Sequence, residues 1–471
     1  GAVKDPSGAS IAGAQVTVTN LQTGLERAVQ SNELGYYTVA LLQPGNYRIT
    51  CQKEGFRQLT RSGITLTVDQ VARVDLALEL GDVTQTLVVQ EDVTLVQTDR
   101  PESSTVIVTT QFDRLPLIQQ NRMRNPVGFI YMTPRVQGNV LPDGSDHVGA
   151  TTQMRFGGGQ QFESEVTVDG IVGGRTQLTG SITEAAPPVD AVREFKVTNS
   201  LMSAEWGHTG IGVVNLQLKS GTNDLHGTAF EYLRNDRLDA RSWLASTRTI
   251  TRQNEFGFTL GGPVWIPRVH HGKDRAFFFV SYAGSRKRGA TDTAAVQIPN
   301  PANLAGDFSN LLDNRGALRR IYDPATTRPD AQLGFVRDPF PGNRVPRDRF
   351  DPVTAKIAGF LPAPNAAGTL NYRGQIGEIV LDPDTFVLKL DHSFAAQHRV
   401  GGSLNTTKIP RLLIRSPLPP PLPSDASDQI IKGYTARLTY DYVIRPTLLK
   451  QLTLGYNLFD HNNLTVTKRV Y

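Results

Sequence analysis

The sequence predicts a mainly β protein: an N-terminal immunoglobulin-like β-sandwich, a mixed globular region, and strands of a transmembrane antiparallel β-barrel. Apolar and polar side chains alternate with a period of two in many segments, and clusters of Gly, Pro, Asn and Asp separate these segments. Long helical periodicity is hard to find. In the C-terminal half the alternating runs reach about ten residues, the length that a tilted strand needs to cross a bilayer.

Residues 1–80 carry the short strands expected of a sandwich. Val16 and Val18 alternate with polar neighbours, and the same alternation runs from Val74 to Leu80. Turn-forming residues separate such runs, for example Pro-Gly-Asn at 44–46. Several short strands in so short a segment predict a small β-sandwich. Because a fold by itself implies no function, a passive spacer is the first interpretation and a ligand-binding module the second.

The next two segments are less regular. Residues 81–95 are expected to form a connector of mixed polarity that contains the extended run Thr-Leu-Val-Val at 86–89. Residues 96–220 combine short apolar runs with many glycines, including those at 157–159. This composition predicts a mixed α/β or β-rich globule.

Residues 221–471 carry the strongest signal. Apolar and aromatic side chains such as Tyr434, Leu438 and Tyr440 alternate with polar ones such as Thr439. One apolar face and one polar face are typical of a strand between lipid and water, although a soluble antiparallel sheet with one wet face shows the same pattern. The alternation predicts strands at residues 226–235, 254–265, 275–285, 384–393, 398–407, 430–443 and 449–460.

The connections between these strands alternate in length, which favours the barrel. The long ones are 236–253, 286–383 and 408–429, and the short ones are 266–274, 394–397 and 444–448. Outer-membrane barrels have short periplasmic turns and long external loops, whereas a soluble sheet has no reason to sort its loops by side. So few strands cannot close a wide barrel, and hydrocarbon does not tolerate an open sheet edge. We therefore expect either the N-terminal part of a longer barrel or strands that belong to another closed assembly.

Composition and charge argue against several classes of protein. The 49 Lys and Arg residues and the 44 Asp and Glu residues give a net charge of only +5 over 471 residues. So small a positive charge does not indicate a nucleic-acid-binding protein. The single cysteine, Cys51, excludes an intramolecular disulfide and a multi-cysteine metal site. No apolar run is long enough to predict a transmembrane helix.

Motifs of catalysis and metal binding are absent from the sequence. It contains no phosphate-binding loop and no zinc-protease motif. His270 and His271 are adjacent but lack a third ligand, and Asp143 and Asp146 lack the spacing of a calcium loop. We therefore predict that the protein is not an enzyme and has no catalytic residue, metal site or cofactor.

Motifs near the N-terminus resemble a known module. They are Gly-Ala-Val-Lys-Asp-Pro-Ser-Gly at 1–8, Gly-Tyr-Tyr at 35–37, Leu-Gln-Pro-Gly-Asn-Tyr at 42–47 and Gly-Phe at 55–56. Together they resemble the carboxypeptidase-regulatory-like β-sandwich domain. Despite its name, that module is not catalytic, and it commonly precedes transporters of the outer membrane.

Motifs along the rest of the chain resemble TonB-dependent transporters, and among them the Oar-like subgroup. Four motifs of this sequence resemble the family's junction between the plug and the first barrel strand. They are Ala-Glu-Trp-Gly at 204–207, Gly-Ile-Gly-Val-Val-Asn at 210–215, Lys-Ser-Gly-Thr-Asn at 219–223 and His-Gly at 226–227. The Oar-like signature continues with Gly-Gly-Pro at 261–263, Phe-Phe-Phe at 277–279, Gly-Asp-Phe-Ser at 306–309, Tyr-Asp-Pro at 322–324 and Phe-Pro-Gly-Asn at 340–343. The family's barrel is far longer, so the resemblance also implies that this chain is an N-terminal part.

The resemblance implies a division into domains. Residues 1–80 are then a periplasmic sandwich, 81–95 a connector, 96–220 a plug, and 221–471 the first strands of the barrel. The connector contains the candidate TonB box, which consists of Thr86, Leu87, Val88, Val89 and Gln90. Such a box is extended and unpaired, so that it can add as a strand to the energising partner. The same run is equally consistent with the first plug strand or the last strand of the sandwich.

The implied function is energised uptake of an unidentified substrate by a transporter in the outer membrane of a Gram-negative bacterium. The implied partners are a TonB-type protein of the periplasm, outer-membrane lipid and the extracellular substrate, with no nucleic acid. Plug loops at 139–163 and 171–187 are expected to face the ligand, with Arg155 and Arg175 as polar contacts. The long connection 286–383 is expected to form a lid, because loops of this length are usually functional or disordered.

Two other interpretations stay open. In the first, the barrel anchors an adhesion or assembly scaffold whose sandwich and loops bind other proteins without transport. Deletion of Thr86–Gln90 distinguishes it, because uptake needs this segment and adhesion does not. In the second, a regulatory domain is attached to a peptidase. That interpretation predicts zinc in the purified protein, and the missing ligand motif argues against it.

Overall fold

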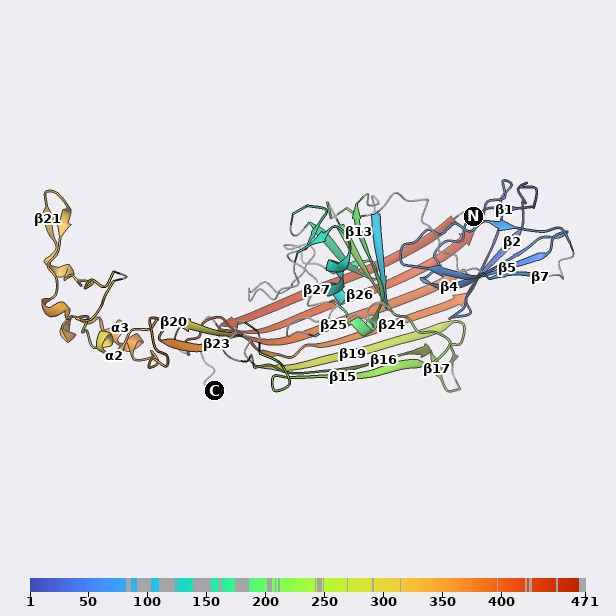
Figure 1. Ribbon diagram of the computed structural model, residues 1–471. Helices are drawn as coiled ribbons and strands as arrows, with labels where there is room; N and C mark the ends of the chain where they lie inside the picture. The colour runs from blue at the N-terminus through green and yellow to red at the C-terminus, as the bar shows by residue number, and fades with distance from the viewer. Residues whose placement is uncertain are drawn as a thin grey trace.

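Three bodies of β-structure make up the fold, and we name them the sandwich, the inner sheet and the wall sheet (Figure 1). The wall strands run along the length of the molecule, with the sandwich at one end and the segment 289–371 extending beyond the other end. The computed structural model describes residues 1–81, 86–90, 103–109, 123–124, 126–138, 154–160, 163–173, 186–200, 206–207, 209–210, 212–241, 243, 248, 250–268, 270–289, 292–313, 315–395, 397–419, 422, 426–445 and 448–465.

The sandwich is built by residues 1–81 and 86–90. Its larger sheet has the order β3-β2-β4-β5-β7, and a parallel pair of β1 and β6 packs with it around one core. The strands are β1 (Val3–Lys4), β2 (Gln15–Asn20), β3 (Glu26–Gln30), β4 (Gly45–Gln52), β5 (Gln58–Leu66), β6 (Leu76–Ala77) and β7 (Thr86–Gln90). Alternation buries Tyr47, Ile49 and Cys51 on one side of β4, as the period-two pattern predicts.

Tyr37 and Cys51 place polar atoms inside the sandwich core. The hydroxyl of Tyr37 donates a hydrogen bond to the carbonyl oxygen of Val74 at 2.7 Å. Burial raises the pKa of the Cys51 thiol to about 12, so this cysteine is a small apolar core residue and not a reactive thiol.

The inner sheet is a mixed five-stranded sheet in the order β12-β11-β14-β13-β8. Strand β11 runs parallel to β14, and the other neighbours are antiparallel. Its strands are β8 (Ser103–Val108), β11 (Ser164–Val168), β12 (Ile171–Val172), β13 (Val192–Ser200) and β14 (Gly212–Leu218). Two 3-10 helices, η1 (Pro126–Met132) and η3 (Val189–Ala191), and the short pair β9 (Val136–Gln137) and β10 (Arg155–Phe156) accompany it. Phe156, Phe195 and Leu216 lie at the centre of its core.

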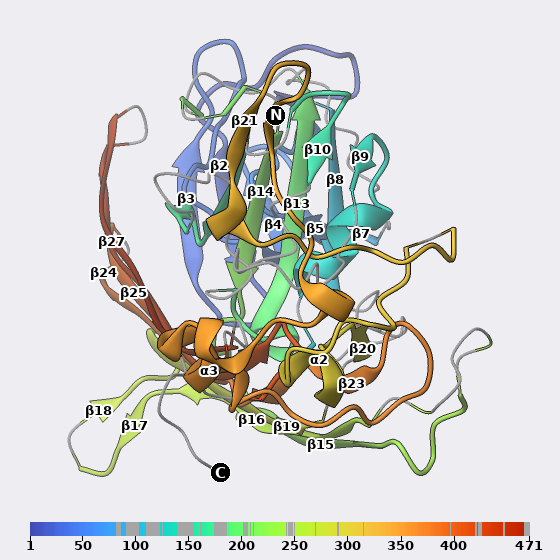
Figure 2. The same ribbon diagram turned by 90° about the vertical axis from the view of Figure 1, so that its left-hand side faces the viewer.

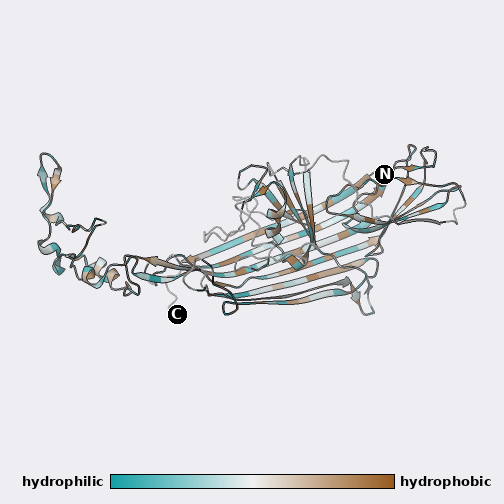
Figure 3. Cartoon of the chain, viewed as in Figure 1, coloured by the Kyte–Doolittle hydropathy of each residue, from teal (hydrophilic) through white to brown (hydrophobic). Residues whose placement is uncertain are grey.

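The wall sheet has nine strands, and all seven strands expected from the alternation are present in it. These are β15 (His226–Asn235), β16 (Arg252–Pro263), β19 (Ala276–Arg288), β24 (Asp384–Ala395), β25 (His398–Ile414), β26 (Ala426–Arg445) and β27 (Leu448–Thr465), and each pairs antiparallel with the next. Several run longer than expected, because backbone pairing continues beyond the segment in which one face is apolar. Figure 3 shows hydrophobic and hydrophilic residues alternating along these strands.

The long connection 286–383 differs from the open loop that we expected. It contains β20 (Asp292–Val296) and β23 (Tyr372–Leu381), which pair with each other and extend the wall sheet. Between them lie α2 (Pro301–Leu304), α3 (Pro352–Ala358), η4 (Pro324–Thr326), η5 (Pro341–Asn343), η6 (Arg347–Arg349) and the hairpin of β21 (Arg328–Asp330) and β22 (Gly334–Val336). A second small hairpin, β17 (Trp265–Ile266) with β18 (His270–His271), occupies one of the short connections. Within the described residues, no helix has both the length and the apolarity to span a membrane.

The wall sheet curves around the inner sheet, as the end view in Figure 2 shows. Its two faces differ in chemistry. Large apolar side chains such as Phe386, Leu438 and Leu454 are exposed on the convex face. Polar side chains such as Ser281 and Gln429 are buried on the concave face. Apolar outside and polar inside is the arrangement of a barrel wall between lipid and a polar lumen.

The bond between Tyr37 and Val74 gives a first prediction. Tyr37→Phe should lower the free energy of unfolding of the sandwich by about 1–2 kcal/mol, because a buried carbonyl loses its donor. Hydrogen exchange of the β4 amides in the whole protein measures this loss. Tyr36→Phe is the matched control, because the side chain of Tyr36 is exposed. Equal exchange in both variants would contradict the prediction.

Candidate functional site

The candidate site is the interface at which the inner sheet, the wall sheet and the sandwich meet. Polar contacts join these bodies at several points. Asp169 and Arg124, at the two junctions with the wall described first, are largely withdrawn from solvent, whereas Asp69, at the junction with the sandwich, is exposed. The number and burial of these contacts determine how much free energy is needed to separate one body from another.

Asp169 and Lys389 join the inner sheet to the wall. Asp169 lies in the turn between β11 and β12 with φ +49°, and its carboxylate lies 3.1 Å from the ammonium of Lys389 on β24. The side chains are 0% and 5% exposed. The amide of Leu218 donates to Asp169 at 2.9 Å, and Lys389 donates to the carbonyl of Leu218 at 3.3 Å. Two charges so deeply buried need these additional hydrogen bonds to offset their desolvation.

Arg124 makes a second junction with the wall. Its guanidinium pairs with Glu255 on β16 at 2.8 Å and with Asp190 in η3 at 2.7 Å. Its backbone amide also donates to Glu255 at 3.1 Å. The guanidinium carbon lies 4.2 Å and 4.8 Å from the ring centres of Tyr232 and Phe230 on β15, which are cation–π distances. One arginine therefore links a 3-10 helix of the inner body to two wall strands.

Asp69 joins the sandwich to the inner sheet. It has φ +52° in the turn after β5, and its carboxylate accepts a hydrogen bond from the amide of Asn215 on β14 at 2.8 Å. Lys196 on β13 donates to the backbone carbonyl of Asp69 at 3.4 Å. The neighbouring Val68 donates its backbone amide to the carboxyl of Glu194, also on β13. A single turn of the sandwich thus contacts the central strand β14 of the inner sheet and its neighbour β13.

Glu194 carries a shifted pKa at this junction. Burial is the largest effect and raises the pKa above the ordinary value of 4.5. The charge of Arg193 and the bond from Val68 act in the opposite direction, and the charge of Asp69 adds to the rise. The folded protein therefore binds a proton at Glu194 more tightly than the unfolded chain does.

The sandwich also contacts the wall directly. Asn223, just before β15, donates its backbone amide to the carbonyl of Gln22 at 3.0 Å. The side chain of Asn223 also exchanges hydrogen bonds with Asp274 in the turn before β19, at 2.6 Å and 2.8 Å. These contacts place the loop between β2 and β3 against the end of the wall sheet that carries the short connections.

A cavity of about 870 Å³ lies between the three bodies. Tyr37 and Asp69 of the sandwich, Asn215 of the inner sheet, and Arg399, Arg437 and Asp441 of the wall line it. Arg399 pairs with Asp391 at 2.7 Å and lies 4.0 Å from Asp441. Because the lining carries charges of both signs, it does not favour a ligand of one charge.

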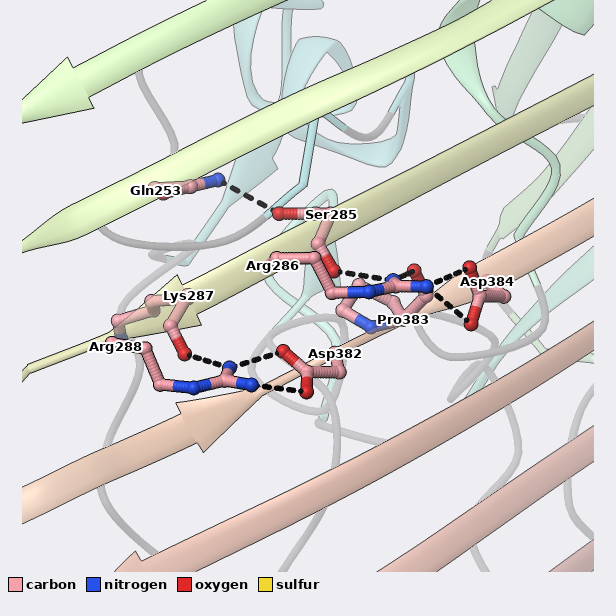
Figure 4. Close-up of polar contacts among 8 residues, drawn as sticks. All are labelled: Gln253, Ser285, Arg286, Lys287, Arg288, Asp382, Pro383 and Asp384. Carbon is pink, nitrogen blue, oxygen red and sulfur yellow. Dashed lines mark hydrogen bonds and ion pairs between the residues drawn. The ribbon is translucent and has the colours of Figure 1, made fainter.

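The opposite end of the wall holds the base of the long connection (Figure 4). Arg286 makes two hydrogen bonds to Asp384, at 2.9 Å and 3.1 Å. Arg288 likewise makes two to Asp382, at 2.5 Å and 2.9 Å. Paired bonds of this kind fix orientation as well as distance. They hold the start of β24 against the end of β19, near the point where the segment 289–371 leaves the wall.

The structure places only part of the predicted site. Thr86–Gln90 forms β7, which pairs with β5 at the edge of the sandwich sheet. This pairing matches the alternative of a last sandwich strand and differs from the unpaired segment expected of a TonB box. Arg155 lies in β10 with an exposed side chain. Arg175 and most of the loops 139–163 and 171–187 lie outside the described residues. Within the described residues, no group of three or more His, Cys, Asp or Glu side chains could hold a metal ion.

Sequence reasoning missed the residues that join the bodies. Lys389 offered a usable signal, because it is a cation on the face of its strand that points away from Phe386, Leu388 and Leu390. Asp169 and Asp69 offered none, since each is an acidic residue in a polar turn, of which the chain has many.

Residues 217–470 match the family described as "Outer membrane beta barrel domain". The chain belongs to this family. Residues 1–79 match a second family, described as "Carboxypeptidase regulatory-like domain". The TonB-dependent transporter Oar of Myxococcus xanthus is 26% identical over 329 residues, which cover 66% of this chain. The chain spans 29% of the length of that relative. These similarities confirm the Oar-like resemblance and place this family member in the outer membrane of a Gram-negative bacterium.

Solved structures of outer-membrane receptors are also similar. The ferric enterobactin receptor PfeA of Pseudomonas aeruginosa has a TM-score of 0.43 and 13% identity, and the similarity covers 77% of this chain and 41% of that one. The outer membrane transporter YddB of Escherichia coli has a TM-score of 0.42 and 13% identity, covering 75% of this chain and 38% of that one.

The pair Lys389–Asp169 gives a second prediction. Lys389→Met leaves a buried carboxylate without its cation, so the inner sheet should lose about 3–5 kcal/mol of stability within the wall. Adding Asp169→Asn to this variant should recover part of the loss, because the uncompensated charge is gone. Urea unfolding followed by exchange of the β14 amides measures both.

The exposed pair of Arg57 and Glu79 provides the control for this cycle. Glu79→Gln should change stability by no more than about 1 kcal/mol, because an exposed ion pair contributes little. Strictly additive losses in Lys389→Met and Asp169→Asn would show that the two side chains do not interact.

The raised pKa of Glu194 gives a third prediction. The contribution of Glu194 to the stability of the folded inner sheet should be fully present below pH 4.5 and should be lost as the pH rises through the raised pKa, because the folded state binds the proton more tightly than the unfolded chain. Exchange of the β13 amides against pH measures this stability. Glu194→Gln should remove this dependence, whereas Glu54→Gln, at an exposed position, should leave it unchanged. A pH dependence that survives Glu194→Gln would assign it to another group.

Proposed function

We propose that the chain is the N-terminal part of a TonB-dependent outer-membrane transporter that takes up an extracellular substrate. The observation that carries the proposal is the inner sheet, which lies against the polar face of the wall and is joined to it by Lys389–Asp169. A folded body inside a barrel closes the lumen, as a plug does. In this proposal residues 96–220 are the plug, 221–471 begin the barrel, and 1–80 lie in the periplasm.

The interface combines apolar contacts of Phe279 and Val387 with polar ones, and its polar part suits a plug that must move. When charged and hydrogen-bonded contacts separate, their polar groups form new hydrogen bonds with water, and these offset part of the free energy lost with the contacts. An apolar interface of the same size would have no such compensation. Force from a TonB-type periplasmic protein would act on the candidate box Thr86–Gln90, by strand addition, and would reach the inner sheet at β8. No covalent chemistry is needed, and the substrate stays unidentified.

The alternative is an outer-membrane adhesion or assembly scaffold without transport. The segment 289–371 favours it, since this segment is partly folded and extends beyond the wall (Figure 1). Its base is fixed by Arg286–Asp384 and Arg288–Asp382. The two functions differ in whether a periplasmic partner is required.

Substitution at Val88 provides the test. In the full-length protein, Val88→Pro should weaken binding to the purified periplasmic domain of the TonB-type protein by at least about tenfold, because proline removes a backbone donor from the added strand. Val88→Ile keeps the donor and should bind within about twofold of the parent. Deletion of Thr86–Gln90 should abolish uptake in cells. A parent protein that does not bind the TonB-type domain would favour the scaffold.

A further inference from the structure

Strand β7 is the candidate TonB box, and one of its backbone edges is already used. Thr86–Gln90 lies parallel to β5, with Gln58 opposite Thr86 and Ser62 opposite Gln90. On its other side β5 pairs with β4, so β7 is the outermost strand of the sandwich sheet. A segment that must pair with another protein is therefore held in its own protein's sheet.

We infer that the sandwich stores Thr86–Gln90 on the edge of β5, and that a TonB-type partner must release β7 from β5 before it can displace the inner sheet. This inference rests on the proposed function, because it concerns how that partner gains its binding segment. It assigns the sandwich a regulatory role in place of a passive one.

The path of the pulling force supports storage. The chain runs from β7 through residues 91–102 to β8, which pairs with β13 in the inner sheet. While β7 stays on β5, tension on β7 passes into the sandwich. The sandwich contacts the inner sheet through side chains, such as Asp69 with Asn215, and not through a shared strand. Tension therefore reaches β8 along the chain only after β7 has left β5.

The short length and the parallel direction of the pairing between β7 and β5 allow β7 to be released reversibly. Its pairing with β5 is five residues long and parallel, and parallel pairing is slightly less stable per residue than antiparallel pairing. A strand of the partner replaces the backbone hydrogen bonds that β7 loses, so the exchange costs little free energy. Until then, the apparent affinity of the partner for β7 is its intrinsic affinity multiplied by the fraction of molecules in which β7 is unpaired from β5. It also covers the edge of β5, which would otherwise expose unpaired backbone groups.

A reversible disulfide between β5 and β7 tests the inference in the full-length protein. Thr60 and Val88 are register partners, so Thr60→Cys with Val88→Cys can lock the two strands together. The oxidised form should bind the purified periplasmic domain of the TonB-type protein at least about tenfold more weakly than the parent, and dithiothreitol should restore binding. Cys51 is buried in the core and does not compete for the new bond.

A second disulfide within the same sandwich serves as the control. Thr19 on β2 and Arg48 on β4 are also register partners, and neither belongs to β5 or β7. Oxidised Thr19→Cys with Arg48→Cys should bind within about twofold of the parent. Tight binding by the oxidised Thr60–Val88 variant would overturn the inference, because the partner would then add to the outer edge of a strand that stays in place. Failure of the parent and of both reduced variants to bind would instead reject the proposed function.

Hydrogen exchange of the parent protein adds a readout that needs no substitution. On binding of the TonB-type domain, the amides of β5 between residues 58 and 62 should lose protection, because their edge becomes open. The amides of β2 should keep theirs, because β2 pairs with β3 and β4. Unchanged protection of β5 in a saturated complex would contradict release of β7.

Discussion

The side-chain period of two along a β-strand is the constraint on which the rest of this structure depends. Each wall strand that presents apolar side chains to lipid must present its other residues to the inside. The polar face of the wall, with Ser281, Thr385 and Gln429, is therefore a consequence of the apolar face. Whatever lies inside must satisfy that polar face, and the inner sheet does so with Asp169 opposite Lys389.

The inner side of the wall determines how the inner sheet is held. The apolar core of the inner sheet includes Phe279 on β19 and Val387 on β24, so apolar packing continues from the sheet into the wall. Arg124 and Lys389 add ion pairs to this packing. The inner sheet is therefore attached to the wall by apolar contacts and by charged contacts together.

The backbone hydrogen-bonding edges of the strands are the second constraint on this structure. In the wall these edges are paired permanently, whereas at β7 the pairing can be exchanged for pairing with a partner. The wall strands from β15 to β27 are long and antiparallel, and such pairing is difficult to break. The pairing of β7 with β5 is short, parallel and at the margin of the sandwich. The same kind of hydrogen bond thus builds a stable wall in one place and a releasable contact in another, and length and position make the difference.

The sequence by itself determined the fold class and the positions of all seven expected wall strands, because a two-residue period is a local property that survives in any context. Motifs also identified the family. The tertiary structure decided what those strands contact. That Asp169 meets Lys389, that Asp69 meets Asn215, and that Thr86–Gln90 lies on β5 all depend on segments far apart in the chain. No local pattern encodes such partners, because a charge in a turn or an extended run is compatible with many neighbours until the sheets have formed.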